Sequence, residues 1–61
     1  MLIEILNESA ETVLKEEMSL ATFKDGVEDW IMEMYTATIK PRNTLEKAYI
    51  ESLNNELITI I

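Results

Sequence analysis

Neither cysteine nor histidine occurs in the 61 residues of this chain. The first absence excludes disulfide bonds, and the two together remove the usual zinc ligands and the commonest catalytic thiol and imidazole groups. A chain of this length buries only about 60% of its unfolded surface, so cross-links are a common aid to its stability. We therefore expect no cofactor, no metal site and no enzymatic activity, and we expect self-association to add to the stability.

Basic residues are also scarce, since five lysines and arginines face twelve acids and leave a net charge of −7. Residues 1–33 carry nine acids and two bases, a charge of −7, whereas residues 34–61 carry three of each. A negative field repels nucleic acids and anionic lipids and attracts basic protein surfaces. We expect a basic protein partner and no direct contact with nucleic acid.

Long apolar runs are missing too. The first residues, MLIEIL, are interrupted by Glu4 and have no basic residue before them. They are shorter than the roughly 20 residues of a membrane span and lack the pattern of a signal peptide. The sequence therefore predicts no contact with a membrane and a cytoplasmic location.

The only tryptophan and the only proline mark the segment 25–40, which we interpret as the central helix. At 100° per residue, its apolar side chains form an arc too wide for one neighbouring element. Asp25 is the preferred N-cap, which places Gly26 in the first turn, and Pro41 ends the helix. A bent helix that continues through residues 20–27 is the alternative to a turn there.

Two further helices are predicted on either side of this segment. Residues 2–20 have apolar side chains at three-four spacing, although Glu17 falls within the apolar stripe. Residues 44–60 show a second such stripe, and Asn43 with Glu46 has the spacing of a capping box. The predicted fold is all-α: one domain over residues 1–61, built as a small three-helix bundle or a helical hairpin completed by oligomerisation.

The two terminal segments leave a second fold open. MLIEIL and LITII are rich in leucine and β-branched residues, so both are compatible with strands. In that case the two segments pair beside the helices and the fold is mixed.

These patterns predict a small regulatory or inhibitor protein that acts by binding another protein, such as a basic nucleic-acid-binding protein. The alternative is a structural, homo-oligomeric assembly module, with a dimer favoured. The acidic composition, small size and predicted helical fold of the chain are typical of bacterial or phage accessory proteins. The candidate electrostatic contacts are the acids Glu4, Glu8, Glu11, Asp29 and Glu33. The candidate apolar contacts to a partner or second copy, which lie off the main stripes, are Met32, Ile39, Ile58 and Ile61.

Overall fold

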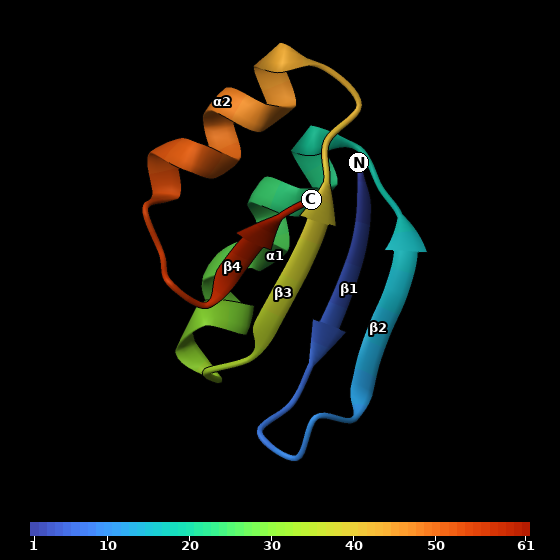
Figure 1. The fold of residues 1–61 in the computed structure, drawn as a ribbon, viewed down its shortest axis with the longest axis vertical. Helices are drawn as coiled ribbons and strands as arrows, with labels where there is room; N and C mark the ends of the chain where they lie inside the picture. Colours follow the sequence, from blue (N-terminus) through green and yellow to red (C-terminus); the bar gives the residue numbers. More distant parts are fainter.

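The computed structural model, which describes residues 1–61, contains a four-stranded sheet and two helices (Figure 1). In chain order the elements are β1 (Leu2–Leu6), β2 (Thr12–Glu17), α1 (Leu20–Met32), β3 (Thr36–Lys40), α2 (Thr44–Leu53) and β4 (Ile58–Ile60). The fold is therefore mixed α/β, and the prediction of an all-α helical bundle is wrong.

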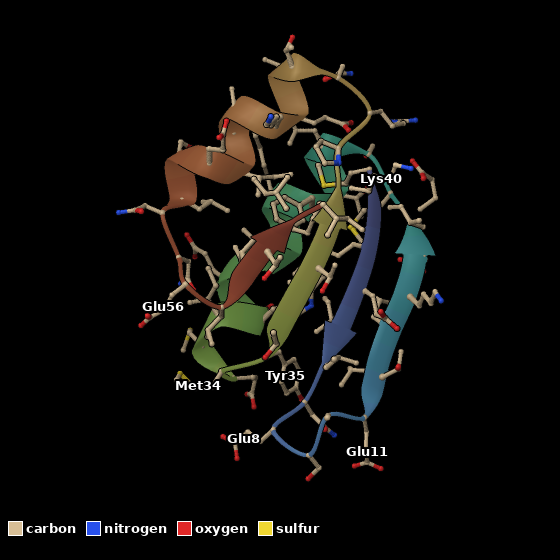
Figure 2. All side chains as sticks on the ribbon, in the orientation of Figure 1. Glu8, Glu11, Met34, Tyr35, Lys40 and Glu56 are labelled. Carbon is tan, nitrogen blue, oxygen red and sulfur yellow. The ribbon has the colours of Figure 1, made fainter.

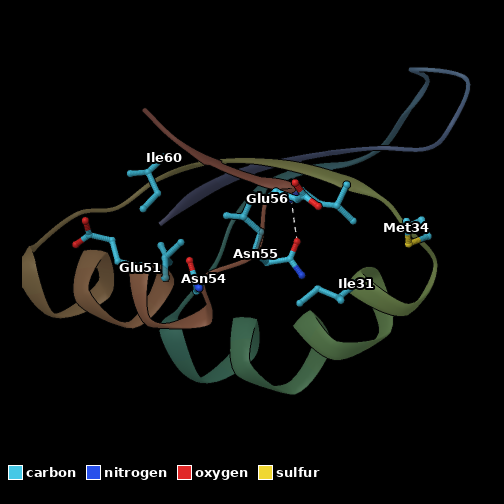
Figure 3. A pocket seen from close by; sticks show the side chains of 10 residues that line it. Ile31, Met34, Glu51, Asn54, Asn55, Glu56 and Ile60 are labelled. Atoms are coloured by element: carbon cyan, nitrogen blue, oxygen red, sulfur yellow. Dashed lines mark hydrogen bonds between the residues drawn. The ribbon is translucent and has the colours of Figure 1, made fainter.

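The strands are arranged in the order β2-β1-β3-β4. β1 is antiparallel to both of its neighbours, whereas β4 runs parallel to β3 after the crossover through α2. Both helices lie on the same side of the sheet, as Figure 3 shows. One face of the sheet is thus covered by helices and the other has no element packed on it.

The predicted helix over residues 2–20 is replaced by the β1–β2 hairpin. Ile3 and Ile5 are buried and Glu4 between them is not, so the burial follows the two-residue period of a strand. In the turn, the Asn7 side-chain oxygen accepts hydrogen bonds from the backbone N–H groups of Ser9 and Glu11, each at 3.0 Å. The sequence stripe fitted a helix because short apolar runs satisfy both periods.

The predicted central helix over residues 25–40 is divided into α1 and β3. Its start is at Leu20 rather than Asp25, because the Ser19 side chain caps the helix by accepting a hydrogen bond from the Thr22 N–H. Gly26 therefore lies in the middle of α1 and not in its first turn. α1 ends before Glu33, and Pro41 follows a strand instead of ending a helix.

The third predicted helix is confirmed at its start and wrong at its end. The Asn43 side chain accepts a hydrogen bond from the Glu46 N–H at 2.9 Å, as the capping pattern predicts. α2 stops at Leu53 because Asn54 adopts a left-handed conformation. Both terminal segments are strands, as the alternative reading held, but β3 lies between them and they do not pair directly.

The core lies between the sheet and the helices. Its buried apolar residues are Met1, Ile3, Ile5, Met18, Phe23, Val27, Ala37, Ile39 and Ile50. The Phe23 ring is fully buried, and its centroid lies 5.7 Å from that of Trp30 and 6.2 Å from that of Tyr49. Neither helix combines the length and the apolar character that crossing a membrane requires.

Candidate binding surface

Acidic residues gather at one end of the molecule. The turn between β1 and β2 and the C-terminal end of α1 both lie toward the lower end in Figure 2, whereas Lys40 lies toward the opposite end. We call this region the acidic end. Its carboxylates come from Glu8 and Glu11 of the turn and from Asp29 and Glu33 at the end of α1.

No basic side chain neutralises these carboxylates. The four ion pairs of the structure are formed by the Met1 amino group and Arg42 with Glu17 and Glu46, all outside the acidic end. Lys24 and Lys47 belong to the N-terminal halves of their helices. The C-terminus of α1, which carries a partial negative charge of its own, also lies at the acidic end.

The structure places four of the five acids predicted to contact a partner toward the same end of its long axis (Figure 1). Glu8 and Glu11 are exposed in the hairpin turn, and Asp29 and Glu33 are exposed in the last turn and at the C-cap of α1. Glu4 is the exception. It lies within β1, opposite Lys15 on one side and Thr38 on the other, and does not belong to the acidic end.

An apolar groove runs between the two helices and β4, next to the C-terminal end of α1 (Figure 3). Its volume is about 800 Å³. Ile50 is buried at its floor, while most of the other apolar side chains that line it are only half-buried. The lining residues are Ile31, Met34, Ile50, Glu51, Asn54, Asn55, Glu56, Leu57, Ile58 and Ile60.

The rim of the groove is polar and includes no base. Glu51 and Glu56 are exposed there, and neither takes part in an ion pair. Asn55 holds the loop in place, because its side-chain oxygen accepts a hydrogen bond from the Leu57 N–H at 2.8 Å. The groove therefore combines an apolar lining with negative charge at its mouth.

Two residues at this groove have positive φ angles, Met34 at 61° and Asn54 at 47°. Met34 occupies the position after the C-cap of α1, where its N–H donates to the Ile31 carbonyl and the Tyr35 N–H donates to the Trp30 carbonyl. This is the Schellman pattern, in which glycine is the usual residue at the left-handed position. The Met34 side chain is nevertheless 57% exposed at the mouth of the groove.

The residues predicted to make apolar contacts do not form one patch. Met32 is 80% exposed at the end of α1, whereas Ile39 is fully buried in the core and offers no surface to a second chain. Ile58 is half-buried and lines the groove. Ile61 is 69% exposed and lines a separate hollow with Leu2.

A buried polar cluster lies away from the acidic end. The Glu46 side chain, 4% exposed, accepts a hydrogen bond from the Arg42 N–H at 2.8 Å and lies 3.3 Å from the Met1 amino group. The Arg42 backbone hydrogen bond lowers the pKa of Glu46; burial acts in the opposite direction, and the Arg42 side chain and the Met1 amino group lower the pKa further. Glu17, at the end of β2, accepts a hydrogen bond from the same amino group at 3.0 Å. This cluster joins β1, β2 and α2.

Met34, Glu51, Glu56 and Leu57 line the groove but were not predicted from the sequence as candidate contacts. All four fall within predicted helices, whereas three of them, Met34, Glu56 and Leu57, lie in connecting segments. The available signal was the pair Asn54-Asn55, since asparagine favours left-handed and turn conformations.

The side chains offer no group of three acids close enough to hold a metal ion. Comparisons with protein-family models, curated proteins and solved structures found no match. The acidic end and the groove beside it are the two surface features with a defined chemistry.

Proposed function

We propose that this protein acts by binding another protein through the acidic end, and that its partner presents a basic surface. Binding of this kind suits a small regulator or inhibitor that occupies a basic site, such as the nucleic-acid-binding surface of its partner. The observation that carries the proposal is the collection of unpaired carboxylates at one end of the molecule.

The position of the acids at the end of α1 supports a role in binding rather than in folding. A helix C-terminus is stabilised by cations, and a carboxylate there costs about 0.3 to 1 kcal/mol. α1 nevertheless has Asp29 in its last turn, Glu33 at its C-cap and no base in its last turn. The arrangement lowers the stability of the helix and concentrates negative potential where it attracts a basic partner.

Two double variants, each of which removes two negative charges, separate the effect of where the charges lie from the effect of the net charge. Glu8→Gln/Glu33→Gln removes two charges from the acidic end, and Glu16→Gln/Asp25→Asn removes two exposed charges elsewhere. The probe is a fluorescein-labelled peptide rich in lysine and arginine, and its affinity is measured by anisotropy. Two exposed ion pairs worth about 0.5 to 1 kcal/mol each correspond to a loss of about 5- to 30-fold for the first variant.

The control variant should change the affinity by less than about twofold, and raised salt should weaken binding to the wild type. Equal losses in the two variants would show that only the net charge matters. Affinity that does not change with salt would remove the electrostatic basis of the proposal.

The second candidate function is self-assembly as a structural module. It is favoured by the uncovered face of the sheet, where Leu2 and Ile61 line a hollow of about 210 Å³. Sedimentation should then show a monomer–dimer equilibrium that Leu2→Ser/Ile61→Ser shifts to monomer. A wild-type protein that stays monomeric at all concentrations excludes this candidate.

A further inference from the structure

We propose that the groove between α1, α2 and β4 binds an amphipathic basic segment of the partner protein. Apolar side chains of that segment enter the groove, and its lysine or arginine side chains reach Glu51 and Glu56 at the rim. This inference rests on the proposed function and identifies the part of the partner that supplies specificity.

The size and lining of the groove indicate that it receives side chains from outside. A volume of about 800 Å³ is in the range of binding pockets, about 300 to 1,000 Å³. Ile31, Leu57 and Ile60 line it and remain half-buried, so the fold itself leaves their apolar surface in contact with water. Burying that surface against an apolar side chain is favourable.

The negative charge at the rim of the groove favours an occupant with positive charge. Glu51 and Glu56 are the charged residues that line the groove, and no lysine or arginine accompanies them. An anionic ligand such as a fatty acid would bring its carboxylate against these two negative charges, which costs binding energy. The occupant therefore combines apolar groups with positive charge.

The end of α1 adjoins the groove, since Ile31 and Met34 line it, so a partner segment in the groove also reaches the acids at that helix end (Figure 3). An amphipathic helix with basic residues along one side presents this combination of chemistry, and docking of such helices into apolar grooves is a common mode of peptide recognition. A small apolar amine shares part of the chemistry but is too short to contact the acidic end as well.

Met34 supplies an independent indication that the mouth of the groove is used. Its left-handed backbone favours glycine, yet the position carries a large apolar side chain that is mostly exposed. Methionine adapts its shape to varied partners and is frequent on peptide-binding surfaces. Strained backbone conformations are also concentrated at functional sites.

The test uses three fluorescein-labelled peptides of about 12 residues, or about 18 Å of helix, which is shorter than the 31 Å long axis of the protein. The first has leucine on one face and lysine on the other. The second replaces leucine by serine, and the third replaces lysine by glutamine. We expect the first peptide to bind at least about tenfold more tightly than either of the others, which corresponds to about 1.4 kcal/mol.

Variants of the groove then locate the binding site. Glu51→Gln/Glu56→Gln should weaken binding of the leucine–lysine peptide by about 5- to 30-fold and leave the glutamine peptide unchanged. Met34→Gly should weaken the leucine–lysine peptide and leave the serine peptide unchanged. Ala10→Gly is the matched control, because Ala10 also has a positive φ of 62° but lies in the hairpin turn and does not line the groove.

The outcomes separate this inference from the proposed function. If the serine peptide binds as tightly as the leucine–lysine peptide, and only Glu8→Gln/Glu33→Gln weakens it, the groove is not the site but the acidic end still is. If neither lysine peptide binds at low salt, both proposals fail. If Met34→Gly converts a dimer to a monomer in sedimentation, a second copy of the chain occupies the groove and the proposed partner segment does not.

Discussion

Three residues other than glycine adopt left-handed backbone conformations: Ala10, Met34 and Asn54. Each lies at the end of a regular element or in a turn, where the chain must change direction. Asparagine tolerates this conformation because its side chain bonds locally, whereas alanine and methionine gain no such compensation. The surrounding hydrogen bonds of the folded protein hold Ala10 and Met34 in this conformation despite its free-energy cost.

Replacing either of these two residues by glycine should stabilise the protein. The left-handed conformation costs about 1 to 2 kcal/mol for a residue with a Cβ, and glycine removes this cost. The greater freedom of glycine in the unfolded chain lowers the free energy of unfolding by about 0.4 to 1 kcal/mol, which offsets part of the gain. We expect Met34→Gly and Ala10→Gly each to raise the free energy of unfolding by about 0.5 to 1 kcal/mol in urea titrations. A stabilised Met34→Gly variant that binds peptide less well would link the strain at Met34 to binding. A destabilised variant would mean that the Met34 side chain holds the end of α1 in place.

Glu46 should make stability depend on pH. Its pKa in the folded protein is lowered, chiefly by the hydrogen bond from the Arg42 N–H, below the value of about 4.3 that an unfolded chain shows. The unfolded chain therefore takes up a proton at a higher pH than the folded one, and the stabilisation is present above about pH 4.3 and is lost as the pH falls through the folded pKa.

The comparison is with Glu46→Gln, which keeps the shape of the side chain and cannot ionise. Stability against urea should fall more steeply with acidification in the wild type than in the variant. The other acids are present in both proteins, so the difference between the two curves isolates Glu46. Parallel curves would show that its hydrogen bonds do not depend on its charge.

At the scale of elements, the sequence predicted the start of α2 and the helix over residues 25–32, and it left open both the terminal strands and a helix that continues through residues 20–27, as α1 does. It misassigned residues 2–20 as one helix and residues 36–40 as the end of the central helix. Asn43 was predictable because capping is a local interaction with a fixed spacing. β3 was not recognised, because the helical pattern that begins in α1 was extended through residues 36–40, with Ile39 placed off the main stripe. The strand signal in Thr36–Lys40 was its alternation of buried and exposed residues, which only the pairing with β1 enforces.

The candidate site followed the same division. The sequence identified the acidic residues, but the tertiary arrangement places the hairpin turn and the end of α1 toward the same end of the molecule (Figure 1). The groove depends on the early end of α2 at Leu53, since a longer helix would have carried Leu57 and Ile60 along its own surface. The position of the acidic residues and the formation of the groove therefore depend on tertiary packing, which local sequence patterns do not reveal.

The exposed edge of β2 leads to a prediction about self-association. Edge strands that could pair with other chains are commonly protected by charge and by bulges. β2 has Lys15 at its centre, Glu16 and Glu17 after it, and an irregular register beside Leu6. We expect Lys15→Val to cause concentration-dependent association in sedimentation.

Lys47→Val is the matched control, because it removes the same charge from an exposed position on α2. It should stay in the same oligomeric state as the wild type. Association of both variants alike would attribute the effect to net charge or added apolar surface, and not to the strand edge.

At the scale of the whole molecule, the basic residues are unevenly distributed along the long axis, whereas acids occur at both ends. Lys40 and Arg42 lie at the end opposite the acidic end, and the N-terminal halves of the helices contain Lys24 and Lys47. A protein with this distribution of charge orients itself in the field of a basic partner before contact. The same distribution leaves the carboxylates of the acidic end without neighbouring cations, so repulsion among them opposes folding.

The variant Glu33→Gln measures what one of these unpaired negative charges costs in stability, because Glu33 adds its charge at the C-cap of α1. Glu33→Gln should stabilise the protein by about 0.3 to 1 kcal/mol at low ionic strength. Salt screens exposed charges over a length of about 10 Å at 0.1 M, so added salt should stabilise the wild type more than the variant. Asp25→Asn is the control, since Asp25 lies in the N-terminal half of α1, where a negative charge is not disfavoured by the helix dipole. We expect it to give no gain in urea titrations; an equal gain in both variants would mean that total charge, and not the distribution of charges along the molecule, limits the stability of this fold.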